Sequence, residues 1–254
     1  MMEPDNTAEV DEIKERPSWL LPLMALVVTV IFGCVILWSY LGYSLDELLG
    51  NTVSGTERGR LLNVTIGEHS LAVPANYTQY PKDRRDGPRP SIELFTVLPD
   101  FVPFSRARRE EFLSDKKDAR VIVFNISAQD VPLKENDRVE RFLRDFAMPN
   151  GTETDVGLVE YQFKPDSSYT NQRLYVFSTE TGLKGMIRCL RETERMPVPF
   201  CFRETELGND LSLFYRFRKA HLGKWQMIDK NMLELAGGFL RTVPDNTTAV
   251  STNF

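Results

Sequence analysis

The longest apolar stretch of the chain is an uncharged run of 29 residues, from Pro17 to Leu45, bounded by Arg16 and Asp46. A helix rises about 1.5 Å per residue, so this run is long enough to cross the hydrocarbon core of a bilayer, which is about 30 Å thick. Aromatic residues that favour the headgroup level stand near both ends of the run; they are Trp19, Trp38, Tyr40 and Tyr43. The pattern predicts one transmembrane helix, with the lipid bilayer as its partner.

Two other structures compete with a retained membrane anchor. A buried helix of a soluble domain is rarely uncharged over such a length. A cleaved signal peptide has a basic start and an apolar region of about 7 to 15 residues, whereas here the apolar region is longer and residues 1–16 carry six acids and two bases. Gly42 and Ser44 resemble a small-x-small cleavage site, so cleavage stays open as the alternative.

Beyond the span, apolar positions alternate as they do in strands. Residues 61–74 alternate on both sides of a Gly-Glu turn, which predicts a hairpin, and residues 91–98 return to a strand. Residues 119–127 are the most apolar segment, and we expect this strand to lie centrally in a sheet with both faces covered. Residues 105–118 are charged on all sides, which predicts an exposed connector.

Two segments have the period of an amphipathic helix. Residues 131–148 repeat apolar side chains at intervals of three and four, at Val139, Phe142, Leu143 and Phe146. Residues 221–240 place a second apolar set on one helix face, at Trp225, Ile228, Met232, Leu235 and Phe239. A helix with one apolar face must lie on the sheet, and we predict that Trp225 anchors the second one there.

Five short apolar segments lie between these two helices, separated by small polar loops, in residues 158–163, 173–178, 185–192, 200–205 and 211–218. Short strands joined by small loops predict antiparallel neighbours. The sequence therefore predicts an α+β fold, with one N-terminal transmembrane helix followed by a mostly antiparallel sheet covered by two amphipathic helices.

The hairpin ends in the sequence VPANY, residues 73–77, and the final helix ends in a phenylalanine, Phe239. At the level of fold, these features resemble the small α/β/α sandwich domains of the PsbP group. The resemblance implies no activity.

These patterns divide the chain into five parts. They are an acidic disordered cytoplasmic tail at 1–16, a transmembrane signal anchor at 17–45, a juxtamembrane linker at 46–60, an extracytoplasmic α+β domain at 61–241 and a disordered tail at 242–254. Lys14 and Arg16 precede the span and only Arg58 follows it, and this weak basic bias favours a cytoplasmic N-terminus.

Cysteine usage gives a stronger argument for the location. Cys34 lies in the span, and Cys189 and Cys201 are the other two cysteines, on either side of a turn-prone loop. We predict a disulfide between Cys189 and Cys201, which would require an oxidising compartment and stabilise the domain by about 3 kcal/mol. Two buried free thiols are the alternative. Zinc is not expected, because a structural zinc site needs four ligands.

Charge argues against a nucleic-acid partner. The chain has 31 basic and 36 acidic residues, and without residues 1–16 the numbers are 29 and 30. A domain so close to neutral lacks the basic excess that binds nucleic acid.

Catalytic signals are sparse in this sequence. His69 and His221 are the only histidines, and both stand where exposed or capping residues are usual. The chain contains no G-x-S-x-G, Walker, G-x-G-x-x-G or H-E-x-x-H motif. We predict no catalytic, cofactor-binding or metal-binding residues, although carboxylate pairs placed by the fold keep a hydrolase open as an alternative.

Two further sets of residues are candidates for binding. A basic patch for an anionic partner consists of Arg106, Arg108 and Arg109, although its acidic neighbours favour a solvated connector. A helix-packing face in the span consists of Ala25, Thr29 and Gly33, which recur every four residues and would admit a second transmembrane helix. That helix would come from a partner protein or from a second copy in a homodimer; ordinary membrane-helix composition is the alternative.

The sequence contains glycosylation sequons, which bear on whether the chain is eukaryotic or bacterial. Five N-x-[ST] sequences begin at Asn63, Asn76, Asn125, Asn150 and Asn246. In a eukaryotic chain they would mark a glycosylated lumenal domain. Asn125 lies in the most apolar strand, where a glycan would not fit, and we therefore prefer their chance occurrence in a bacterial periplasmic domain.

The sequence as a whole predicts a single-pass inner-membrane (plasma-membrane) protein whose non-catalytic periplasmic domain acts in the interaction or assembly of envelope components. A transmembrane or periplasmic protein is the expected partner. A membrane-tethered hydrolase and a eukaryotic type II glycoprotein are the alternatives.

Overall fold

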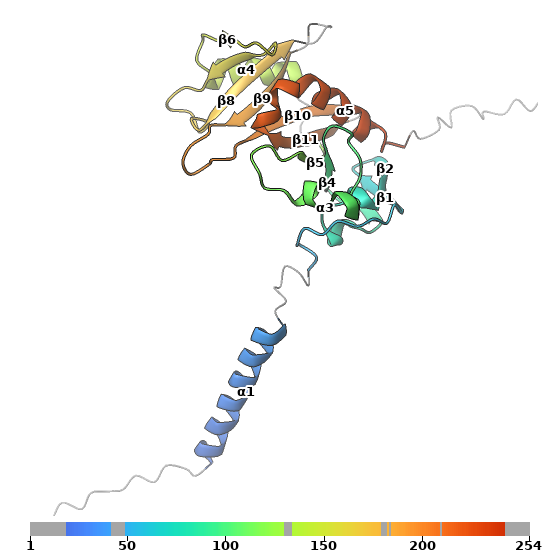
Figure 1. Cartoon of the computed structure of the whole chain (residues 1–254), viewed down its shortest axis with the longest axis vertical. Coiled ribbons are helices and arrows are strands. Elements are labelled where there is room, and N and C mark those ends of the chain that lie inside the picture. Colours follow the sequence, from blue (N-terminus) through green and yellow to red (C-terminus); the bar gives the residue numbers. More distant parts are fainter. Residues whose placement is uncertain are drawn as a thin grey trace, which may run out of the picture. The chain divides into compact units, whose positions relative to one another are not determined.

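The computed structural model of the chain describes residues 19–41, 49–129, 134–178, 182, 184–208 and 210–241. By its contacts the chain divides into two units, residues 1–49 and 50–254 (Figure 1).

The first unit contains one long helix, α1, Leu20–Leu41. Its 22 residues rise about 33 Å. Within it, Leu20–Ser39 has a mean hydropathy of 2.8 and buries none of its length inside the protein. By length and composition, α1 is the one helix among the described residues that is able to cross a membrane, as an anchor or as a signal sequence. The ends of the predicted span, 17–18 and 42–45, lie outside the described residues.

The second unit is built mainly of strands. They are β1 Leu61–Ile66, β2 His69–Pro74, β3 Gly87–Pro88, β4 Ser91–Val97, β5 Val121–Ala128, β6 Thr152–Glu153, β7 Val159–Gln162, β8 Gln172–Ser178, β9 Lys184–Leu190, β10 Phe200–Gly208 and β11 Leu211–Arg218. The helices are α3 Arg109–Leu113, α4 Glu135–Phe146 and α5 Trp225–Gly237. Short 3-10 turns occupy Ala75–Tyr77, Pro81–Asp83, Arg106–Arg108 and Lys219–Lys224.

The small sheet contains the predicted hairpin. Strands β1 and β2 are antiparallel, with Leu62 opposite Val73, and the short β3 adds to β1 in parallel. Gly67 takes a positive φ of 58° in the turn, a conformation that glycine adopts without a steric penalty.

The large sheet has eight strands in the order β4-β5-β11-β10-β9-β8-β7-β6, and every neighbouring pair is antiparallel. The five consecutive segments predicted between the two amphipathic helices are the strands β7, β8, β9, β10 and β11. The predicted α+β class, with a mostly antiparallel sheet, is confirmed.

One face of the large sheet carries the main core. Helix α5 packs here with the β1–β2 hairpin, and both bury side chains against the inward positions of β4, β5 and β8 to β11. From α5 the buried side chains are those of Trp225, Ile228, Met232 and Ala236, while Leu235 is only partly buried.

The other face carries two separate clusters near its two ends. Near one end, helix α4 covers Leu174, Val176 and Met186 through its own Val139 and partly buried neighbours. Near the other end, Phe112 of α3 packs with the rings of Phe95 and Phe104 at centroid distances of 4.7 and 5.3 Å.

Two sequence predictions are wrong in this region. Residues 105–118 include a helix whose Phe112 is only 3% exposed, so the segment is not charged and solvated on all sides. Strand β5 is not covered on both faces: Ile122, Phe124 and Ile126 are buried, whereas the alternate side chains are partly exposed. The reason is that α3 and α4 cover opposite ends of this face, and no helix in the described part of the chain covers the strands between them.

Residues 49–60, the described part of the predicted linker, contain no helix or strand. Ser54 N–H donates to the carbonyl of Gln79 (3.0 Å), and Arg106 N–H donates to the Glu57 carboxylate (2.9 Å). This segment therefore lies against the folded domain for at least part of its length.

Candidate interaction surface

The part of the second face that α3 and α4 leave uncovered forms a hollow of about 400 Å³ over β4, β5, β11 and β10. Six partly exposed side chains line it, which we call the open face; they are Glu93, Val123, Asn125, Phe202, Phe214 and Arg216. Side chains alternate between the two sides of a strand, so all six come from positions opposite to the main core.

Strand register places the open face in two rows that cross the sheet. One row runs from Arg188 on β9 through Phe202 and Arg216 to Val123. The next row runs from Glu204 through Phe214 and Asn125 to Glu93. The rings of Phe202 and Phe214 stack with a centroid distance of 6.1 Å and an interplanar angle of 23°. Aromatic surface is thus concentrated at the middle of the face, with charges around it.

The two arginines of the first row have few protein partners. Arg188 lies over the rings of Phe142 and Tyr169, at 5.4 Å from each centroid, and Arg216 lies 5.5 Å from the Phe200 centroid. Among the described residues, neither guanidinium donates a hydrogen bond or comes within 4.0 Å of a carboxylate. Each guanidinium has five N–H donors, so both retain their capacity to bind an anion.

Arg218 lies close to Arg216 and adds a further positive charge to this region. Its guanidinium lies 4.0 Å from the Phe200 centroid and donates to the Asp115 carbonyl (3.0 Å). Burial lowers the pKa of Arg218, the Asp115 charge opposes this shift, and the like charge of Arg216 lowers the pKa further. Arg216 and Arg218 therefore repel each other across Phe200.

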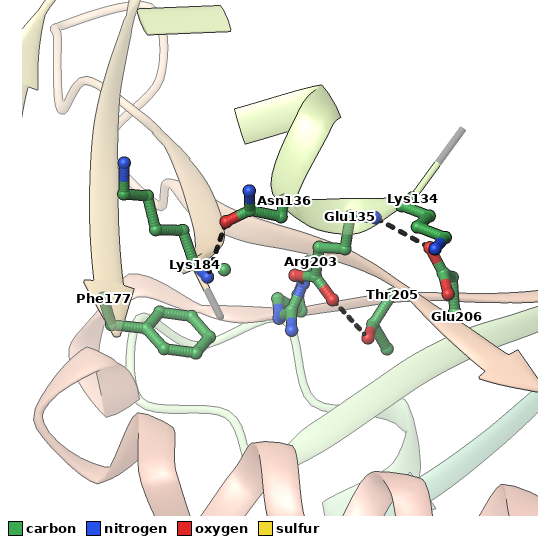
Figure 2. Close-up of a pocket in the computed structure, with 9 residues that line it drawn as sticks. Lys134, Glu135, Asn136, Phe177, Lys184, Arg203, Thr205 and Glu206 are labelled. Carbon is green, nitrogen blue, oxygen red and sulfur yellow. Dashed lines mark hydrogen bonds and ion pairs between the residues drawn. The ribbon is translucent and has the colours of Figure 1, made fainter. Parts of the chain in front are cut away.

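A second hollow, of about 290 Å³, lies where α4 begins and is lined by charged residues (Figure 2). Arg203 on β10 is one of the lining residues, although only 3% of its side chain is exposed. Its guanidinium pairs with Glu135 and, at 3.1 Å, with Asp229 of α5. Thr205 also donates to Glu135 (2.9 Å), and Tyr215 donates to Asp229 (2.7 Å).

The electrostatics of this buried cluster match its geometry. Burial by itself lowers the pKa of Arg203, but the charges of Asp229 and Glu135 outweigh it, so the pKa is raised overall. Burial, followed by the charge of Asp229, raises the pKa of Tyr215 well above its ordinary value. Arg203 thus stays charged and Tyr215 stays a donor.

The ion pairs of the cluster join α4 and α5 to strand β10. Both oxygens of Glu135 are engaged, and the Glu206 carboxylate accepts the backbone N–H of Glu135 (2.7 Å) at the start of α4. A hydrolase needs carboxylates that are free to move protons. The second hollow offers no such pair among its described residues.

Cys189 and Cys201 face each other across β9 and β10 and are joined by a disulfide, with a Cα–Cα distance of 3.9 Å. Both are fully buried in the main core. The bond closes a loop whose ends are 12 residues apart, and a disulfide of this kind fits an oxidising compartment.

The predicted basic patch is largely neutralised by acidic neighbours. Arg106 pairs with Glu57 (3.2 Å), and Arg108 pairs with Asp100 and Glu111 (2.9 Å each). The side-chain hydrogen bonds that Arg108 donates to Glu111 are the main cause of the raised pKa of Arg108. Arg109 lies beside them and is exposed. An anionic partner at this patch stays a prediction.

The small residues of α1, Ala25, Thr29 and Gly33, are predicted to pack against a second transmembrane helix. Thr29 Oγ1 donates to the Ala25 carbonyl (2.8 Å), and a Cβ added at Gly33 would meet nothing within 4 Å in the described residues. This face therefore has room for a neighbouring helix. Packing of α1 against a second copy or against a partner protein stays a prediction.

The open face was not identified from the sequence, although the signal was present. In β11, Leu211, Leu213 and Tyr215 take the inward phase, which leaves Phe214 and Arg216 in the outward phase. An aromatic residue in the outward phase of an interior strand indicates apolar surface on that face, although it does not show whether a helix covers it. Asn125 belongs to the same surface, so the argument that its strand is covered on both faces is wrong for this sequon.

Comparisons with known proteins identify similar folds among solved structures but do not assign the chain to a family. No family model and no curated protein matches the sequence. Among solved structures, the chain is similar to Smlt3025, an immunity protein of the Stenotrophomonas maltophilia type IV secretion system, with a TM-score of 0.55 and 15% identity over 72% of this chain and 94% of that one. It also matches the Neisseria meningitidis iron-regulated outer membrane lipoprotein FrpD, with a TM-score of 0.44 and 12% identity over 76% and 98% of the two chains.

Proposed function

We propose that this protein is a single-pass membrane protein whose folded domain lies outside the cytoplasm and binds another protein of the cell envelope without catalysing a reaction. The observation that carries the proposal is the open face, an aromatic surface at the middle of the large sheet that none of the described helices covers. The anchor would be retained in the inner membrane.

The physical argument starts from the exposed rings. Exposed apolar patches on a folded domain mark interaction sites, because burying apolar surface is worth roughly 25 cal/mol per Å². Phe202 and Phe214 keep part of their surface in water even though they stack on each other. A partner that covers the two rings would gain the free energy of burying them. No described helix or strand of the domain covers them.

The location is supported by two features of the described residues. Helix α1 has the length and hydropathy of a membrane span, and the buried Cys189–Cys201 disulfide fits a domain that folds outside the cytoplasm. The likeness to a secretion-system immunity protein, at 15% identity, supports the fold only, and the binding role rests on the open face.

A photo-crosslinking experiment tests the binding role. We expect a photoreactive benzophenone amino acid in place of Phe214, in the full chain in its native membranes, to form an adduct with another protein. The matched control carries the same amino acid in place of Glu234, an exposed residue of α5, and should form little adduct. Adducts of equal yield at both positions, or none at position 214, would contradict the proposal.

A further inference from the structure

We propose that the open face, together with the adjacent Arg188 of β9, binds a protein segment that carries two carboxylates on either side of an apolar side chain, with the carboxylates paired to Arg188 and Arg216. This inference rests on the proposed function and names the chemistry of the partner. The row Arg188–Phe202–Arg216 is the recognition element, because register places an arginine directly opposite Phe202 on each neighbouring strand.

The unpaired guanidinium groups carry the charge argument. Two other arginines of the large sheet have carboxylate partners: Arg203 pairs with Glu135 and Asp229, and Arg173 pairs with Glu160 at 3.1 Å. Arg188 and Arg216 are partly buried against aromatic rings without such a partner in the described residues. Because a guanidinium in this setting binds a carboxylate in a bidentate manner, a partner that supplies one satisfies donors that the fold leaves open.

The spacing of the row limits what can bind. Neighbouring strands lie about 4.8 Å apart, so Arg188 and Arg216, on the two sides of β10, are separated by about 10 Å at their backbones. The two guanidinium groups lie over different rings, Arg188 over Phe142 and Tyr169 and Arg216 over Phe200, so we assign one carboxylate to each. Two carboxylates at a similar separation would pair with both arginines while a side chain between them packs on the Phe202 ring.

Acidic residues on the same surface fix the orientation of the segment. Glu204 is already paired with Arg138 at 2.8 Å, whereas Glu93 lies at the β4 side of the hollow and comes within 4.0 Å of no basic group among the described residues. The carboxylates of the partner therefore face the β9–β11 side, and a hydrogen-bond donor of the partner is expected near Glu93.

The aromatic floor favours a protein segment over a phosphate or a lipid headgroup. A phosphate would satisfy one guanidinium but leave the rings of Phe202 and Phe214 in water. In the proposed segment, the apolar side chain covers the rings and the two carboxylates pair with the two arginines.

The experiment uses the full chain with the photoreactive amino acid in place of Phe214 in native membranes, with a charge reversal added. Arg216→Glu should lower the yield of the protein adduct by at least about tenfold. Arg144→Glu, which makes the same charge change at an exposed position of α4, should leave the yield within about twofold. Mapping the adduct should identify a partner segment with Asp or Glu next to the crosslinked residue, and reversing that carboxylate to Lys should restore the adduct with Arg216→Glu.

The outcomes separate the two proposals. If the protein adduct forms equally well with Arg216→Glu, the open face binds a partner without this charge pairing, and the inference is overturned while the proposed function stands. If position 214 crosslinks only to lipid, or to nothing, both are overturned. Should Arg216→Glu fail to fold, as judged by loss of the Cys189–Cys201 disulfide, Arg216→Gln replaces it, with an expected loss of at least about threefold.

Discussion

Replacing Trp225 with alanine should lower the free energy of unfolding of the domain by about 3 to 5 kcal/mol. The indole is only 7% exposed, lies 4.2 Å from the Phe177 ring between centroids, and donates from Nε1 to the Val156 carbonyl (2.9 Å). Its loss would open a cavity at the start of α5 and leave the carbonyl without its donor. Denaturant unfolding of the full chain in detergent, followed by far-UV circular dichroism, measures the change.

Phe202→Ala is the matched control, because it removes an aromatic ring from the open face rather than from the main core. We expect it to lower the free energy of unfolding by at most about 1.5 kcal/mol, since part of the ring is already in water. Equal losses for Trp225→Ala and Phe202→Ala would show that the open face is part of the core, and would contradict its assignment as a binding surface.

The second large effect is expected at Arg203. Arg203→Ala leaves Glu135 and Asp229 largely buried without their shared cation, and removing one partner from a buried charge network costs about 3 to 5 kcal/mol. Arg144→Ala removes an exposed arginine whose pair with Asp145 is open to solvent, and should cost about 0 to 1 kcal/mol. The same unfolding measurement compares them. A loss below about 1 kcal/mol for Arg203→Ala would mean that the cluster does not hold α4 and α5 to the sheet.

The strongly periodic parts of the fold were predictable from the sequence. The β1–β2 hairpin, strand β10 and helix α5 each bury one face, so their apolar residues recur with a period of two in the strands and of about 3.6 in the helix. The short α3 was missed because a helix of five residues with one buried side chain, Phe112, has no period to detect.

The coverage of each sheet face was harder to predict. The apolar run in β5 indicated a strand with two covered faces, but an apolar residue such as Val123 can pack beside a cluster at the edge of an uncovered area. Which face a helix covers depends on where it docks, and docking is decided by contacts between segments far apart in the chain. The open face is therefore a property of the tertiary structure.

The buried charge cluster was missed for the same reason. The inward phase of β10 reads Cys201, Arg203 and Thr205, and an arginine at an inward position requires a buried carboxylate. Its partners Glu135 and Asp229 lie 68 and 26 residues away in the sequence, so no local pattern identifies them. Cys189 and Cys201 lie close together in the sequence, and the pair was predictable from spacing and compartment.

We propose that a membrane anchor holds this domain, with its open face, outside the cytoplasm. Two reporters fused after Phe254 of the full chain test it most directly, one active only outside the cytoplasm and one active only inside. We expect the first reporter to be active and the second to be silent. An active cytoplasmic reporter and a silent external one would contradict the claim.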